Sequence, residues 1–292
     1  MAAGERPQDL RCAVCGATGW GSGLRKNDYS YATCGGCGVL RLDPMPAPET
    51  AAALYDEGYF TESTSGGYHD YLADEAIHRR NARRHLDRLE SLGARPPGRL
   101  LEVGAAAGFL LDEARRRRWD PVGVEVAPIA DHARHELGLV VHRRVADLAV
   151  PSDPAAAFDA AVMNQVLEHL PEPDVALTEV AAQMAPGGVL TIETWNRDAQ
   201  VARRLGAGWQ QVTPPSVLWL FSADDLRRLL AAAGFADVTV TRATKWVSVA
   251  TVLGQSADDT GPLRRLADSR VGAIGLPYHL GDLVVVTARR AG

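Results

Sequence analysis

Residues 101–108 read Leu-Glu-Val-Gly-Ala-Ala-Ala-Gly, and they join a short apolar run, 99–103, to a stretch of helical character that begins at Phe109. A glycine directly after a strand lets the backbone turn tightly and approach a ligand, and the helix that follows presents unpaired amide N–H groups at its start. Small residues at such a turn also serve close packing of helix on strand. The stretch therefore predicts a strand–turn–helix unit and a candidate ligand site.

Short apolar runs alternate with helical stretches beyond this turn. The runs read as strands at 99–103, 122–126, 140–142, 158–163 and 189–194, and the stretches between them read as helices at 109–118, 129–137 and 175–184. Strands and helices in alternation indicate a parallel sheet with helices on both faces. We therefore expect a doubly wound α/β core that starts near residue 99.

Two acidic residues follow the second and third predicted strands. Glu125 lies 21 residues beyond Gly104, where a carboxylate can accept both ribose hydroxyls of a nucleoside bound over the glycine turn. Asp147 is placed to accept a hydrogen bond from the exocyclic amine of adenine. The alternatives are a solvated acid near a helix start for Glu125 and a helix cap for Asp147.

All four cysteines lie near the N-terminus, in two C-x-x-C-G motifs separated by 18 residues: Cys12, Cys15, Cys34 and Cys37. Two such knuckles complete a tetrahedron around one zinc ion, and the glycine after each pair can adopt the positive φ that the turn often needs. Four thiolates leave no open position, so we expect a structural zinc. A redox pair or an adventitious metal site is the alternative.

Composition excludes several classes of protein. The chain has 292 residues, 46% of them hydrophobic, and a formal net charge of -5. The length fits one large domain plus a small one, and the charge gives no basic field for holding nucleic acid. The first ten residues lack the apolar run of a signal peptide, and no apolar stretch is long enough to span a bilayer. We expect a cytoplasmic monomer or homodimer with no nucleic-acid or membrane partner.

The sequence becomes most specific after the fourth predicted strand. Residues 164–173 read Asn-Gln-Val-Leu-Glu-His-Leu-Pro-Glu-Pro, and 185–188 read Ala-Pro-Gly-Gly before the next strand. Together with the glycine turn, Glu125 and Asp147-Leu148, these ordered motifs resemble the class I methyltransferases that use S-adenosylmethionine, over roughly residues 97–290. The cysteine-rich start, followed by Leu54-Tyr55 and Gly58-Tyr59-Phe60, resembles a branch with an N-terminal zinc ribbon that modifies sugars, polysaccharides and secondary metabolites.

The resemblance implies a Rossmann-like, doubly wound, seven-stranded sheet whose final antiparallel hairpin uses 236–242 and 283–288. It divides the chain into a small zinc ribbon, a helical linker or lid, and a methyltransferase domain, at 1–46, 47–96 and 97–292. A substrate region is expected at about 195–222, with contacts from Trp209, Gln210 and Gln211, and an insertion at about 243–282. Within the linker, 62–67 reads as a lid over a pocket or as a plain connector.

The resemblance also assigns the site residues. Glu102 lies beside the methionine end of the cofactor, Glu125 holds the ribose, and Asp147 with Leu148 frames the adenine. The full set of expected cofactor-binding residues is Glu102, Gly104, Ala105, Gly108, Glu125, Val126, Asp147, Leu148, Asn164 and Gln165. One departure is visible, because the family usually has glycine where Ala106 stands.

The implied function is transfer of a methyl group from S-adenosylmethionine to a small-molecule acceptor, a sugar or secondary metabolite, by O- or N-methylation. An acceptor that must lose a proton needs a general base, and His169 is the leading candidate, ahead of Tyr68, His69, Glu193 and His279. A nucleotide-sugar- or NAD-dependent oxidoreductase is the first alternative, although the chain lacks a tight G-x-G-x-x-G. A noncatalytic zinc-ribbon binding protein is the second, and it leaves the ordered motifs unused.

Overall fold

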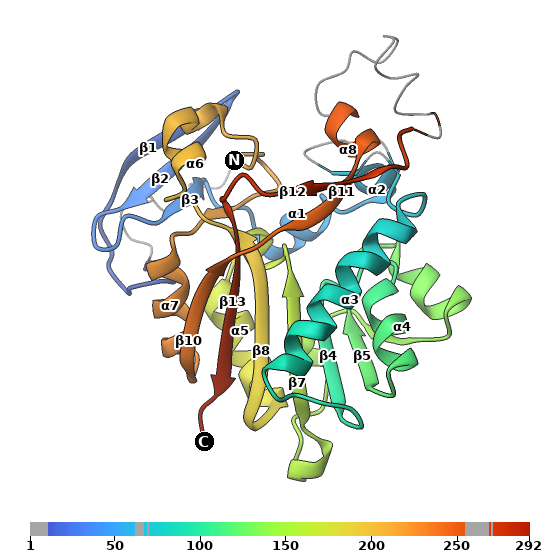
Figure 1. Ribbon diagram of the computed structural model, residues 1–292. Helices are drawn as coiled ribbons and strands as arrows, with labels where there is room; N and C mark the ends of the chain where they lie inside the picture. Colours follow the sequence, from blue (N-terminus) through green and yellow to red (C-terminus); the bar gives the residue numbers. More distant parts are fainter. Residues whose placement is uncertain (1–10, 62–66, 69, 255–268, 270) are drawn as a thin grey trace.

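A computed structural model describes residues 11–61, 67, 68, 70–254, 269 and 271–292. Its centre is a seven-stranded sheet in the order β10-β13-β8-β7-β4-β5-β6 (Figure 1). The strands are β4 (Arg99–Val103), β5 (Asp120–Val124), β6 (Val140–His142), β7 (Phe158–Asn164), β8 (Met184–Trp195), β10 (Phe235–Arg242) and β13 (Leu283–Arg290). Strands β8, β7, β4, β5 and β6 are parallel, and β13 runs antiparallel between β10 and β8. The expected Rossmann-like sheet with its final hairpin is confirmed.

Helices cover both faces of this sheet. The helices α3 (Glu75–Ser91) and α4 (Phe109–Arg116) pack together on one face, and α5 (Pro173–Gln183) and α7 (Ala223–Ala232) pack together on the other. Successive strand residues point to opposite faces, so Leu100 joins the α3–α4 core whereas Leu101 joins the α5–α7 core. The apolar runs of the sequence are continuous because these strands are buried on both sides.

One expected helix differs in the structure, and the linker contains two short helices. The segment 129–137 contains a π-helical turn, His132–Glu136, instead of an α-helix. The segment that precedes α3 contains two short helices, α1 (Pro48–Ala52) and α2 (Glu57–Thr61). The Asp56 side chain accepts the Tyr59 N–H at 3.0 Å, which starts α2 as a separate element.

A second sheet holds the N-terminal segment. It contains β1 (Trp20–Lys26), β2 (Tyr29–Cys34), β3 (Leu40–Asp43) and β9 (Trp219–Leu220), in that order. Strand β9 comes from the larger domain, between β8 and α7 in the sequence, and pairs antiparallel with β3. The Tyr31 hydroxyl, buried beneath this sheet, donates to the Val217 carbonyl at 2.7 Å. The N-terminal segment is therefore joined to the larger domain by shared strands, not only by the linker.

The expected insertion leaves the main sheet after β10. It forms β11 (Lys245–Ser248), α8 (Val249–Gly254) and β12 (Gly275–Tyr278), and β11 pairs antiparallel with β12. The remaining short elements are α6 (Gln200–Leu205) and 3-10 turns at Val145–Asp147, Pro154–Ala156, Leu167–His169 and Gly206–Gly208. In the described part of the chain, no helix has the length and apolar character needed to cross a membrane.

Candidate functional site

A cavity of about 1270 Å³ opens at the carboxyl ends of the parallel strands. Its wall is built from the ends of β4, β5, β7 and β8, from α1 to α3, and from the 245–251 segment. The volume exceeds the roughly 300–1,000 Å³ of a typical small-molecule pocket. The volume therefore leaves room for a cofactor and a small acceptor. Ligands in doubly wound sheets bind at this end of the strands.

The glycine turn after β4 forms the floor of the cavity. Gly104 has φ +77°, and a Cβ there would lie 2.2 Å from Val166 Cγ2, so glycine is required by both the backbone and the space. Ala106 also adopts the left-handed region, with φ 44°, and this is strained for a residue with a Cβ. Its N–H donates to Glu125 Oε2 at 2.9 Å, which helps to hold the strained turn.

Gly108 serves packing. It has φ +82° and stands at the N-cap of α4, outside the cavity wall. A Cβ there would lie 2.6 Å from the Ala133 Cβ. This glycine lets α4 approach the neighbouring segment.

Glu102 and Glu125 enter the cavity from adjacent strands. Glu125 accepts the backbone N–H groups of Ala106 and Ala127, both at 2.9 Å, and burial raises its pKa. Glu102 is buried, and its Oε2 has no hydrogen-bond partner among the described residues. Burial, and then the charge of Glu125, raise the pKa of Glu102 well above its ordinary value. Among the described residues, no cation forms an ion pair with either carboxyl group. The two groups therefore suit a positively charged ligand.

The end of β7 adds a polar pair. Asn164 is the last residue of the strand, and its Oδ1 is buried without a partner among the described residues. Gln165 follows in the left-handed region with φ 53°. Both line the cavity, as do Ala105 and Val126.

The structure places the predicted adenine-framing residues outside the cavity wall. The Asp147 carboxylate accepts the Arg144 backbone N–H at 3.0 Å and pairs with its guanidinium at 3.2 Å, so it caps a 3-10 turn. The Leu148 carbonyl accepts a hydrogen bond from the Gln183 side chain at 3.2 Å. Val145 and Ala146 line the cavity at this point instead. The contacts of the Asp147 side chain are therefore those of a cap, the alternative interpretation of this residue.

His169 faces the cavity at the end of the Leu167–His169 turn. Its Nδ1 lies 2.7 Å from the Ser216 carbonyl oxygen, and its ring packs edge-on against Tyr55. A carbonyl accepts only, so Nδ1 carries the proton and Nε2 of the neutral ring is left as an acceptor. The 216–220 segment, which includes β9, therefore orients His169.

Glu193 is unsuited to the role of general base. Burial alone raises its pKa, but the charges of His85 and Arg84 and the Arg84 hydrogen bond, 2.5 Å long, outweigh burial and lower it. Burial lowers the pKa of His85 to about 4, so Arg84 is the partner that remains charged at neutral pH. Glu193 therefore stays ionised and paired.

The substrate region expected at 195–222 does not line this cavity. Trp209 is buried, and its Nε1 donates to Asp282 at 2.8 Å, so this side chain holds the C-terminal part of the fold. The wall is completed by residues of the insertion: Lys245, Trp246, Val247, Ser248 and Thr251. Sequence reasoning missed them because no motif marks them. The one available signal is that Lys245 and Lys26 are the sole lysines among 31 basic residues.

Aromatic rings cover the cavity on the side of α1 to α4: Tyr55, Tyr59, Phe60, Tyr68, Tyr71, His78 and Phe109. The rings contact one another, as in the stacked pair Tyr71–His78 with centroids 3.9 Å apart. The expected lid loop lies mostly outside the described residues, as does His69. Consecutive arginines at the end of α4 form a salt-bridged surface, because Arg115 and Arg116 pair with Asp112 and Arg117 pairs with Asp87.

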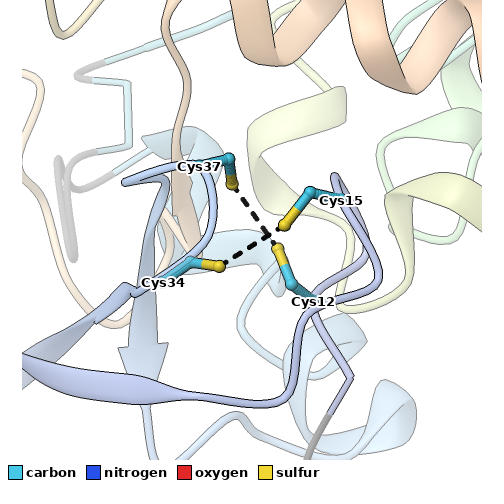
Figure 2. A group of neighbouring side chains, drawn as sticks. All are labelled: Cys12, Cys15, Cys34 and Cys37. Carbon is cyan, nitrogen blue, oxygen red and sulfur yellow. Dashed lines mark hydrogen bonds between the residues drawn. The ribbon is translucent and has the colours of Figure 1, made fainter.

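The four cysteine sulfur atoms converge on one point (Figure 2). All lie within 4.8 Å of one another, with Cys12–Cys37 at 3.8 Å and Cys15–Cys34 at 3.6 Å. Zn–S bonds of about 2.3 Å place tetrahedral sulfurs about 3.8 Å apart, so the distances suit one zinc ion and exclude a disulfide. Gly16 and Gly38 have φ 74° and 77°, as the knuckle turns require. The cluster fits a zinc ribbon.

Comparison with known sequences decides the family. A sequence profile described as "Methyltransferase domain" matches residues 74–240, more than half of the chain. This chain belongs to the methyltransferase-domain family. The ubiquinone biosynthesis O-methyltransferase of Hahella chejuensis is 31% identical over 160 residues, 48% of this chain and 67% of that protein. The enzyme of that name from Xanthomonas axonopodis pv. citri is 33% identical over 118 residues, 38% of this chain and 49% of that protein. The methyltransferase thus spans half to two thirds of these relatives.

Solved structures share the fold of this methyltransferase. A Burkholderia thailandensis 1,6-didemethyltoxoflavin-N1-methyltransferase, solved with S-adenosylhomocysteine, has a TM-score of 0.53 at 22% identity, over 92% of this chain and 100% of that one. A Bacillus halodurans protein described as a putative methyltransferase has a TM-score of 0.51 at 13% identity, over 72% of this chain and 100% of that one. The methyltransferase is therefore a class I, S-adenosylmethionine-dependent enzyme, as its ordered motifs predict.

The cavity of the methyltransferase fits this cofactor. S-adenosylmethionine carries an ammonium and a sulfonium group, and buried acceptor atoms without partners are costly unless a ligand satisfies them. Glu102 Oε2 and Asn164 Oδ1 are two such atoms in the described cavity wall. When bound, the cofactor supplies an activated methyl group whose leaving thioether is neutral.

Proposed function

We propose that this methyltransferase transfers a methyl group from S-adenosylmethionine to a sugar or secondary metabolite, by O- or N-methylation. The observation that carries the proposal is the pair Glu102 and Glu125 flanking the Gly104 turn, in a cavity with room for a second small molecule. A wall rich in aromatic rings suits a small organic acceptor. Relatives named as O-methyltransferases and the fold shared with an N-methyltransferase support both modes.

In this proposal Glu102, Asn164 and Gln165 bind the methionine portion of the cofactor. Glu125 accepts the ribose hydroxyls with the lone pairs that its two backbone hydrogen bonds leave free. Val126, Val145 and Ala146 lie against the adenine. Asp147 and Leu148 contribute by holding the backbone of the turn that carries residues 145 and 146. Positioning of the acceptor against the methyl group supplies most of the rate.

We assign His169 the role of proton acceptor for the acceptor hydroxyl or amine. Its Nδ1–H donates to the Ser216 carbonyl and fixes the ring, and Nε2 has no hydrogen-bond partner among the described residues. His169→Asn is expected to slow methyl transfer by roughly 10²- to 10⁴-fold, the usual contribution of a general base, with unchanged cofactor binding. Unchanged turnover of an acceptor by this variant would remove the assignment.

We assign the four cysteines a structural zinc in a ribbon at 1–46 that precedes a helical linker at 47–96 and the methyltransferase domain at 97–292. A closed set of four thiolates stabilises the fold and offers no position to substrate. We place the protein in the cytoplasm, as a monomer or homodimer. An assay that finds much less than one zinc per chain would remove the ribbon.

The proposed reaction is tested with S-adenosylmethionine carrying a labelled methyl group and panels of sugars, phenols and amines. Label in a small molecule, with an equal yield of S-adenosylhomocysteine, is the expected result. Label found only in protein or nucleic acid would contradict the proposal.

A further inference from the structure

We propose that Lys245 is a catalytic residue that binds the reacting oxygen of the acceptor as an oxyanion, so that the acceptors are acidic hydroxyl compounds such as phenols and enols. This inference rests on the proposed methyl transfer and names its acceptor class. It sets phenols and enols apart from sugar alcohols, whose hydroxyls ionise far less readily.

Lys245 lies in the cavity wall beside the predicted methyl-donor site. It is the first residue of β11, it is half-buried, and its Nζ donates to Gln165 Oε1 at 3.0 Å. The same Nζ stands 4.6 Å from the centroid of the Trp195 ring. Gln165 is one of the residues assigned to the methionine portion, so the ammonium group directly contacts the proposed methyl-donor site.

The segment that carries Lys245 is fixed on α3. Asn81 pairs with both backbone groups of Trp246, at 2.8 and 2.9 Å, and the Ser248 hydroxyl donates to Asp74 Oδ2 at 2.7 Å. The Arg80 guanidinium stacks over the Trp246 ring at 3.2 Å. These contacts hold the β11 backbone at Trp246 and Ser248, and Gln165 holds the ammonium itself. Lys245 therefore has a defined position, as a residue that binds a reacting atom requires.

Lys245 forms no ion pair with a described residue. Glu193 is the acid whose charge acts most strongly on Lys245, but Arg84 already binds it at 2.5 Å. No described carboxylate lies within 4.0 Å of Lys245 Nζ. Among hydrogen bonds to described residues, one of its three N–H donors is used, by Gln165. The titratable and charged groups that face it are Glu193, Glu168, Asp282, Arg84 and His78. Two donors remain for an anionic oxygen.

The choice of lysine suits this role. Of the 31 basic residues of the chain, Lys26 and Lys245 alone are lysines. An ammonium group presents compact donors to a single oxygen, whereas a guanidinium presents a fork suited to carboxylate or phosphate. Burial lowers the pKa of Lys245 to about 8, against the opposing charges of Glu193 and Glu168, so the group is still largely an ammonium at neutral pH.

The proposed step balances as follows. The O–H bond of the acceptor breaks, and its proton passes to His169 Nε2 or to water. The oxyanion, held by the Lys245 ammonium, attacks the methyl carbon, and the new O–C bond forms as the S–C bond breaks. The electron pair of the S–C bond returns to sulfur, which becomes a neutral thioether. No oxidant, reductant or metal takes part.

The test uses 4-nitrophenol, whose anion has a visible absorption band that its neutral form lacks. The full-length protein, saturated with S-adenosylhomocysteine, is titrated at a pH below the phenol's own pKa. We expect the wild type to raise the phenolate fraction, Lys245→Arg to keep part of the effect, and Lys245→Met to weaken phenolate binding at least tenfold. Lys26→Met is the matched control, because it removes the other lysine of the chain, and it is expected to behave as the wild type.

Two outcomes overturn the inference. They are a wild type with no phenolate band and a Lys245→Met variant that binds phenolate as tightly as the wild type. Calorimetry with S-adenosylhomocysteine on the same samples separates the causes. If the cofactor product binds and the phenolate effect is absent, the assignment of Lys245 is wrong and the proposed function stands. If the cofactor product does not bind, both fail.

Discussion

Glu102 is expected to lower the stability of the free protein at neutral pH and to increase its affinity for the methyl donor. In the described structure its Oε2 is buried without a partner, and burial and Glu125 raise its pKa. An acid whose pKa is raised on folding contributes stability below its unfolded pKa and loses it as pH rises toward the folded pKa. Each unit of elevation corresponds to about 1.4 kcal/mol. Glu102→Gln, which stays neutral, should therefore unfold at the same temperature as the wild type at acidic pH and at a higher temperature at pH 7–8.

The same substitution should weaken binding of S-adenosylmethionine. Glutamine keeps an acceptor oxygen but loses the charge, and a hydrogen bond to a charged group exceeds a neutral one by about 1–2 kcal/mol. The dissociation constant should rise roughly 5- to 30-fold, since 1.4 kcal/mol is tenfold. Wild-type affinity should also rise with pH as Glu102 ionises, and that rise should be absent in the variant.

The assays are thermal unfolding between pH 5 and 8 and calorimetric titration of the donor at the same pH values. Asp224→Asn is the control, because its carboxylate is exposed and lies outside the cavity wall. Donor affinity unaffected by Glu102→Gln, or a variant less stable than the wild type at pH 8, would refute the reasoning.

Three further predictions concern the turn and the cysteine cluster. Gly104→Ala should lower the free energy of unfolding by about 2–5 kcal/mol, because its φ is left-handed and a Cβ would lie 2.2 Å from Val166. Gly187→Ala, with φ +79° and open space around it, should lower the free energy of unfolding by only about 1–2 kcal/mol. Both are measured by denaturant unfolding, and equal losses would contradict the packing argument. Ala106→Gly should raise the melting temperature by about 1–2 °C, because relief of the strained φ exceeds the added chain entropy, and a drop would show that the turn is not strained. Removal of the metal by a chelator should lower hydrogen-exchange protection at 216–220 as well as in the ribbon, because β9 pairs with β3. Protection lost only at 11–43 would show that the ribbon unfolds independently of the larger domain.

The main sheet and the glycine turn could be predicted from the sequence because each rests on local signals. The strands at 99–103 and 140–142 were predicted to the residue. The first is an apolar run buried on both faces, and it ends sharply at the glycine turn. The four cysteines converge as predicted because the spacing of each C-x-x-C fixes a knuckle. The glycines after each pair have the expected positive φ for the same reason.

Other features depend on contacts between distant segments, which leave no pattern in the sequence. The pairing of β9 with β3 joins residues 219–220 to 40–41, and no motif announces it. Trp209 looks like a substrate contact but is buried against Asp282, 73 residues away. Lys245 reaches the cavity because Asn81 and Asp74 hold β11 on α3. The acceptor side of the site could therefore not be predicted from the sequence.

The central claim is that Glu102, Gly104, Glu125 and Asn164 form a binding site for S-adenosylmethionine. Calorimetric titration of the zinc-loaded protein with S-adenosylmethionine, and separately with NAD, tests it most directly. The structure predicts one saturable site per chain for S-adenosylmethionine, weakened by Glu102→Gln, and no heat with NAD. A folded protein that gives no heat with S-adenosylmethionine, or that binds NAD in its place, would contradict the claim.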